Sequence, residues 1–150
     1  MALALAPPPD AAVTTLRHRV PFFETDAMGV VHHSNYVRWL EVARIRWLEE
    51  HHRPYPEYVA AGRHFAVIGL EVDYRLPVTF DEEVAVTVWP EWVKAATLRM
   101  AYSLRTTRGL VGYAATEHAM VDDEGRPRRI ARDERDALRK LCGAKGERSP

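Results

Sequence analysis

The chain has 150 residues, a length that predicts one domain with a hydrophobic core of its own. Its 21 Lys and Arg residues balance its 21 Asp and Glu residues, so neither nucleic-acid binding nor attraction to an anionic membrane is expected. No apolar run approaches the roughly 20 residues that insertion across a bilayer requires, and the single cysteine, Cys142, suits a reducing cytoplasm.

The N-terminal segment MALALAPPPDAA is apolar, lacks a basic start and contains three consecutive prolines. These features favour a disordered tail over residues 1–13 rather than a signal peptide. From Thr14 to Phe23, alternating side chains predict a first strand. Pro21 has no N–H to donate, so it belongs at an edge or a bulge of that strand.

The longest helical pattern runs over residues 34–50. Tyr36, Leu40, Ala43 and Trp47 fall on one stripe at 100° per residue. Further apolar residues fill much of the remaining circumference, which predicts a mostly buried helix that ends before the prolines at 54 and 56.

Four more strands follow from alternating apolar residues over about 66–74, 84–88, 98–105 and 110–121, with a turn at Thr107–Gly109. Pro90 is expected to interrupt the second of these patterns just before Trp92. The sequence DDEG at 122–125 predicts another turn. A short surface helix over 133–141 is expected to end at Gly143, and residues 143–150 are predicted to be a disordered tail.

The order of one strand, one helix and four strands with short connections predicts an α+β domain over residues 14–142. An antiparallel sheet would pack one face on the long helix. The free edges of such a sheet predict self-association, into a homodimer or a homotetramer.

The loop before the helix carries Asp26, Gly29, His32 and His33. N–H groups without an intrahelical acceptor point outward at a helix N-terminus, where negative charge is best tolerated. Asp26 could act there in catalysis or simply cap the helix. Neighbouring histidines rarely aim at one ion, so no metal site is predicted. No GxSxG motif competes as a nucleophile.

Three stretches, FFETDAMGVVHHSNYVRWLEVAR, YRLPVTFDEEV and VDDEGRPRRI, resemble the hotdog-fold acyl-CoA thioesterases. The resemblance is strongest to the 4-hydroxybenzoyl-CoA thioesterase group and to the bacterial thioesterases associated with the Tol–Pal system, and it covers residues 15–135. It implies five or six antiparallel strands wrapped around one central helix, with two subunits joined side by side. It also implies hydrolysis of acyl-CoA to a free acid and coenzyme A, without a cofactor.

The resemblance assigns Asp26 as the catalytic carboxylate and places the N–H of His33 at the thioester carbonyl. In the Tol–Pal group a histidine side chain at the His33 position is also implicated. That group often carries a tyrosine where this chain has Phe22, so a three-residue catalytic scheme is not expected. The residues assigned to substrate binding are Gly29, Val30, Val31, His32, Asn35 and Tyr36.

Asp26 could attack as a nucleophile through a mixed anhydride, or activate water as a general base. His33 could act through its backbone N–H or its imidazole. The alternatives to an acyl-CoA thioesterase are an acyl-carrier-protein thioesterase, a hotdog dehydratase and an acyl-CoA-binding protein without turnover.

Overall fold

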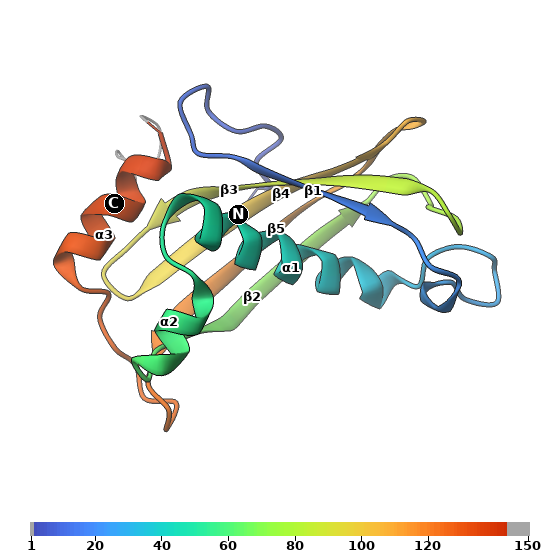
Figure 1. The fold of residues 1–150 in the computed structure, drawn as a ribbon. Coiled ribbons are helices and arrows are strands. Elements are labelled where there is room, and N and C mark those ends of the chain that lie inside the picture. The colour runs from blue at the N-terminus through green and yellow to red at the C-terminus, as the bar shows by residue number, and fades with distance from the viewer. Residues whose placement is uncertain (1, 144–150) are drawn as a thin grey trace.

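The computed structural model describes residues 2–143, so most of the predicted C-terminal tail lies outside the described residues. In chain order the elements are β1 (Thr14–Arg19), the 3₁₀ turn η1 (Phe22–Glu24), α1 (His33–His51), α2 (Tyr55–Ala60), β2 (His64–Tyr74), β3 (Glu83–Val93), β4 (Thr97–Thr106), β5 (Gly109–Val121) and α3 (Arg132–Leu141). Figure 1 shows α1 lying across one face of the sheet, with α3 at the end far from the loop that precedes α1.

The five strands form one antiparallel sheet in the order β1-β3-β4-β5-β2. Strands β3, β4 and β5 follow one another as hairpins, β1 adds to the β3 edge, and β2 adds to the β5 edge. This arrangement confirms the predicted α+β fold with one long helix on an antiparallel sheet.

Two strand predictions are corrected by proline. The first strand ends at Arg19 rather than Phe23, because Pro21 cannot continue the ladder and residues 22–24 turn instead. In β3, by contrast, Pro90 does not end the strand. A register shift between Pro90 and Trp92 absorbs it as a bulge.

Helix α1 packs most closely over β1 and β3, where Trp39, Leu40, Ala43 and Trp47 are buried. Its other side is open, and Val42 on that side is about half exposed (49%). The prediction of a mostly buried helix is therefore wrong for this side, because the helix lies toward one edge of the sheet.

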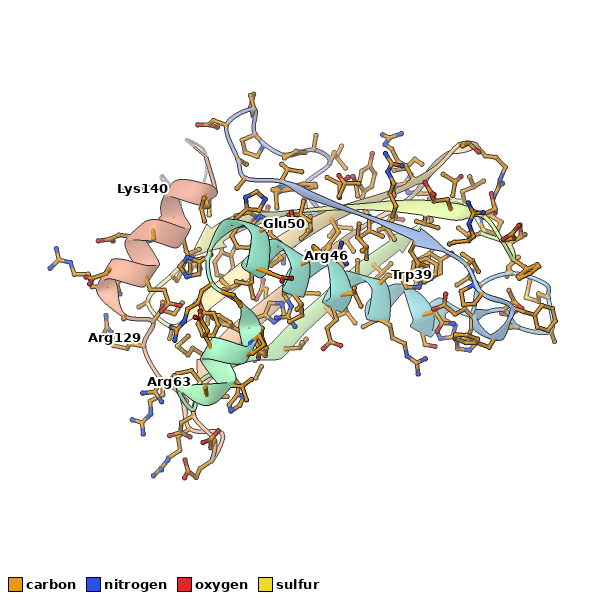
Figure 2. The ribbon with its side chains drawn as sticks, viewed as in Figure 1. Trp39, Arg46, Glu50, Arg63, Arg129 and Lys140 are labelled. Atoms are coloured by element: carbon orange, nitrogen blue, oxygen red, sulfur yellow. The ribbon has the colours of Figure 1, made fainter. Side chains whose placement is uncertain are left out.

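Residues just before β1 contact both long helices. The carbonyl of Ala12 accepts a hydrogen bond from Nε1 of Trp47 at 3.0 Å, and the N–H of Ala12 donates to the carbonyl of Leu141 at 2.9 Å. At the end of α1, Glu50 accepts a hydrogen bond from Oγ1 of Thr14 at 2.7 Å (Figure 2). These contacts tie residues at the end of the predicted N-terminal tail to α1 and α3.

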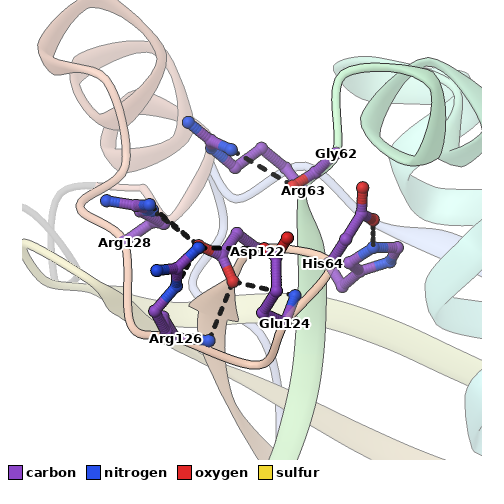
Figure 3. A network of polar contacts seen from close by, with 8 residues as sticks. Gly62, Arg63, His64, Asp122, Glu124, Arg126 and Arg128 are labelled. Carbon is purple, nitrogen blue, oxygen red and sulfur yellow. Dashed lines mark hydrogen bonds and ion pairs between the residues drawn. The ribbon is translucent and has the colours of Figure 1, made fainter.

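The predicted turn at 122–125 is present and is held by a buried carboxylate, Asp122 (Figure 3). Its Oδ1 accepts hydrogen bonds from the N–H groups of Glu124 and Arg126, and its Oδ2 pairs with the guanidinium of Arg128 at 2.8 Å. These donors lower the pKa of Asp122 to about 2. The network therefore fixes the chain between β5 and α3 at neutral pH.

No helix in the described part of the chain is long and apolar enough to cross a membrane.

Candidate active site

The loop between η1 and α1 is a tight hairpin. Isolated bridges join Thr25 to Val31 and Val30 to Thr79, and the N–H of Asp26 donates to the carbonyl of Val30 at 2.9 Å. Gly29 closes the turn at φ +78°, a conformation that favours glycine, and no atom lies within 4 Å of where its side chain would begin. Gly29 thus allows the backbone conformation that the loop requires.

This hairpin orients the carboxylate of Asp26. Its Oδ1 accepts a hydrogen bond from the N–H of Met28 at 2.9 Å, and its Oδ2 has no hydrogen-bond partner within residues 2–143. The side chain is only partly buried. One carboxylate oxygen therefore remains available to a water molecule or a substrate.

The N-terminus of α1 follows directly and presents one free donor. His32 is the N-cap, and its Nδ1 accepts a hydrogen bond from the N–H of Ser34 at 3.2 Å. The N–H of Asn35 donates to the carbonyl of His32. His33 is the first helical residue, and its N–H has no acceptor among the described residues, as expected for this position.

A buried carboxylate that the sequence analysis missed, Glu24, fixes this geometry. It is 6% exposed, and its two oxygens bind Nε2 of His18 at 2.6 Å and Nε1 of Trp39 at 3.0 Å. Its backbone carbonyl accepts hydrogen bonds from the N–H of His32 and from Nδ2 of Asn35. Glu24 therefore joins β1, the loop and α1. The sequence feature that could have indicated this role is an acidic residue directly after the apolar pair at 22–23.

Asn35 was predicted to bind substrate, but the structure buries it and directs its amide nitrogen to Glu24. His32 likewise caps the helix, although its ring is exposed and stacks on that of His33 at 4.2 Å. Through these contacts, Asn35 and His32 stabilise the start of the helix.

Replacing Glu24 with alanine is expected to lower the free energy of unfolding by about 3 kcal/mol, because Nε1 of Trp39 loses its buried acceptor and His18 loses its partner. Urea titration followed by tryptophan fluorescence measures the change. The control Glu49→Ala removes an exposed glutamate of α1 and should change stability by less than about 0.5 kcal/mol. Equal stability of the two variants would remove the anchoring role of Glu24.

An open groove of about 260 Å³ lies beside the start of α1. The groove is lined by Val30, Val31, His33, Tyr36, Tyr74, Arg75, Leu76 and Pro77. It brings together four of the predicted site residues, whereas Asp26, Gly29, His32 and Asn35 do not line it.

Tyr74, at the end of β2, was missed by the sequence analysis because it is remote in sequence from the loop. Its hydroxyl donates to the carbonyl of His33 at 3.0 Å, and its ring meets that of Tyr36 edge-on at 4.9 Å. Burial and the neighbouring Tyr74 raise the pKa of Tyr36 to about 12, and burial also raises the pKa of Tyr74. Both hydroxyls are therefore neutral at pH 7.

Phe22 occupies the position where the resembling group often carries tyrosine. Its ring is 74% exposed and meets the edge of Phe80 at 5.7 Å. No group of three His, Cys, Asp or Glu side chains within residues 2–143 is placed to hold a metal ion.

The fold defines a class of α+β proteins in which one long helix packs on a five-stranded antiparallel sheet, and comparison with known proteins identifies the family. Residues 20–141 match the thioesterase-like superfamily, so the chain belongs to that family. This confirms the resemblance seen in the sequence and the assignment to the thioester hydrolases.

Individual relatives agree with the family. A structure of the 1,4-dihydroxy-2-naphthoyl-CoA (DHNA-CoA) thioesterase from Staphylococcus aureus superposes with a TM-score of 0.84 at 26% identity, covering 92% of this chain and 96% of that one. A hypothetical protein from Thermus thermophilus gives a TM-score of 0.80 at 34% identity over 86% of this chain and 97% of that one. The acyl-CoA thioester hydrolase YbgC of Escherichia coli is 35% identical over 68 residues, which are 45% of this chain and 51% of that protein.

Proposed function

We propose that this protein hydrolyses an acyl-CoA thioester to a free carboxylic acid and coenzyme A. The observation that carries the proposal is the loop that holds the Asp26 carboxylate, with one oxygen free, and leads into the unpaired N–H of His33 at the start of α1. The names of the S. aureus and E. coli relatives support coenzyme A as the carrier.

The chemistry divides between these two groups. Asp26, as general base, takes a proton from water while the water oxygen bonds to the thioester carbon. The carbonyl oxygen becomes an oxyanion, and the His33 N–H at the positive end of α1 stabilises it. The carbon–sulfur bond then breaks as the oxyanion returns to a carbonyl, and the coenzyme A thiolate takes the proton held by Asp26 and leaves as the thiol, which restores the Asp26 carboxylate.

In the second route Asp26 itself attacks the carbonyl and expels the thiolate. The product is a mixed anhydride, which water cleaves to return the Asp26 carboxylate and the free acid. Both routes use the same free oxygen of Asp26 and the same N–H donor of His33.

Release of free thiol from a panel of short, long and aromatic acyl-CoAs, detected with a thiol reagent, tests the proposed function. We expect steady turnover on at least one member. Turnover only on acyl-carrier-protein thioesters would favour the first alternative, and hydration or dehydration without thiol release would favour a dehydratase. Tight acyl-CoA binding with no reaction would make the protein a binding module.

A homodimer is expected to be the minimal active unit. Strand β2 is an edge strand, and Val67, Ile68 and Leu70 on it are about half exposed. Light scattering should give at least twice the chain mass of 17.1 kDa. Ile68→Lys should shift the protein toward monomers and lower activity, because charge on an edge strand opposes pairing. The control Val59→Lys changes a similarly exposed residue on α2 and should leave the mass unchanged.

A fully active wild-type monomer would contradict this prediction. Association to a homotetramer and location in the cytoplasm stay predictions that the same preparation can address, by mass and by cell fractionation.

A further inference from the structure

A second cavity, of about 120 Å³, lies beneath the open side of α1, between the helix and strands β2, β4 and β5. Polar side chains line it from both sides. Arg38, Glu41 and Arg44 come from the helix, and Tyr102, Thr116 and His118 come from the sheet. The reactions proposed above use none of these six residues.

Arg44 gives this cavity a buried positive charge that is incompletely paired. The residue is 5% exposed, and its Nη1 is buried without a hydrogen-bond partner within residues 2–143. Its Nη2 lies 3.9 Å from Oε1 of Glu41, whose side chain is 69% exposed. A buried cation with an unused donor is costly, and an exposed carboxylate at that distance offsets little of the cost.

The sheet wall of the cavity is neutral and hydroxyl-rich. Oγ1 of Thr116 lies 2.8 Å from both the hydroxyl of Tyr102 and Nε2 of His118. Burial and the nearby Arg44 lower the pKa of His118 to about 3, and burial raises the pKa of Tyr102 to about 12. Nδ1 of His118 is buried without a hydrogen-bond partner in the described structure. At neutral pH the charges lining this cavity are therefore those of the buried Arg44 and of Arg38 and Glu41, which are both exposed.

The cavity follows the groove at His33 along the same two elements. Tyr36 of α1 and Tyr74 of β2 line the groove, whereas Val37 of α1, one residue further, and Leu70 of β2, four residues before Tyr74, line the cavity. The groove and the cavity thus follow one another along α1 and β2 in the direction from His33 to Arg44.

We propose that this cavity binds a carboxylate at the far end of the acyl group, so that the substrates include CoA thioesters of dicarboxylic acids. The inference rests on the proposed function for the position of the thioester. A guanidinium pairs with a carboxylate through charge-assisted hydrogen bonds, and the Arg44 guanidinium, whose Nη2 lies 3.9 Å from the exposed Glu41, supplies the charge for such a pair. The volume approaches the roughly 150 Å³ that holds a benzene molecule elsewhere, so it has room for the carboxylate and a few methylenes.

The helix also sets the length of the acyl group. Arg44 follows His33 by eleven residues, which is about 16 Å along a helix axis, and its side chain leans back toward the N-terminus. Succinyl-CoA is too short to span the remaining distance. The eight-carbon suberyl-CoA should reach, with its free carboxylate at Arg44.

The test compares suberyl-CoA with octanoyl-CoA, which has the same chain length and no free carboxylate. For each enzyme the ratio of the two kcat/KM values is measured by thiol release. Arg44→Gln should lower the suberyl-to-octanoyl ratio by about tenfold to a hundredfold, because a charge-assisted contact is lost. The matched control Arg46→Gln changes an exposed arginine of the same helix and should leave the ratio unchanged. Thr116→Val keeps the side-chain shape and should lower the ratio by a smaller factor. This variant replaces Arg44→Gln in the test if Arg44→Gln does not fold.

Binding of free suberate gives a second readout that needs no turnover. Suberate should raise the melting temperature of the wild type and of Arg46→Gln but not of Arg44→Gln. If no acyl-CoA releases thiol, the proposed function fails, and the subsite is tested by suberate binding alone. A rise in melting temperature that requires Arg44 would then still support the subsite. If thiol is released, the suberyl-to-octanoyl ratio tests the subsite. An unchanged ratio in both Arg44→Gln and Thr116→Val would overturn the inference and leave the thioesterase proposal standing.

Discussion

Asp26→Asn is expected to reduce acyl-CoA hydrolysis by more than roughly a thousandfold, because the amide keeps the shape of the side chain but can neither accept a proton nor attack. The amide oxygen can still accept the hydrogen bond from Met28, so the loop should keep its conformation. Steady-state thiol release measures the loss, and an unchanged thermal midpoint shows that the fold is retained.

Asp133→Asn is the matched control, since that aspartate is exposed on α3 and far along the chain from the loop. It should retain wild-type activity. Wild-type turnover in Asp26→Asn would end the catalytic assignment of Asp26, whichever of the two routes is considered.

His33→Pro is expected to reduce kcat by about a hundredfold to a thousandfold relative to His33→Ala, the cost of removing one oxyanion donor in other acyl-transfer sites. Proline removes the N–H, while alanine keeps it and removes only the imidazole. The first helical position tolerates proline, and His32 already has the extended conformation (φ −63°, ψ 134°) that a following proline requires. Both variants should therefore fold.

The same pair assigns the role of the imidazole. If the ring of His33 also takes part, His33→Ala alone should lower the rate by about 10²–10⁴ and alter the acid limb of the pH profile. Equal activity of His33→Pro and His33→Ala would show that the backbone N–H does not stabilise the oxyanion.

Local patterns in the sequence determined the elements and the position of the loop. The helix predicted over 34–50 is observed over His33–His51, because a period of 3.6 and the prolines at 54 and 56 are properties of the chain itself. The turn at DDEG and the positive φ of Gly29 follow from single residue types in the same way. The family resemblance of the loop then placed Asp26 before the helix N-terminus.

Only the tertiary structure shows which residues contact that loop and which polar side chains lack a hydrogen-bond partner. Glu24 meets Trp39 across 15 residues, and Tyr74 meets His33 across 41, so no local pattern brings either pair together. The side chains facing the second cavity likewise come from α1 and from three strands of the sheet. Arg44 is buried, so its positive charge is removed from water and favours an anionic partner, which an exposed arginine would not need. Whether the residue is buried depends on where α1 lies on the sheet. Spacing along the chain does not encode that placement, because it results from the packing of the whole domain.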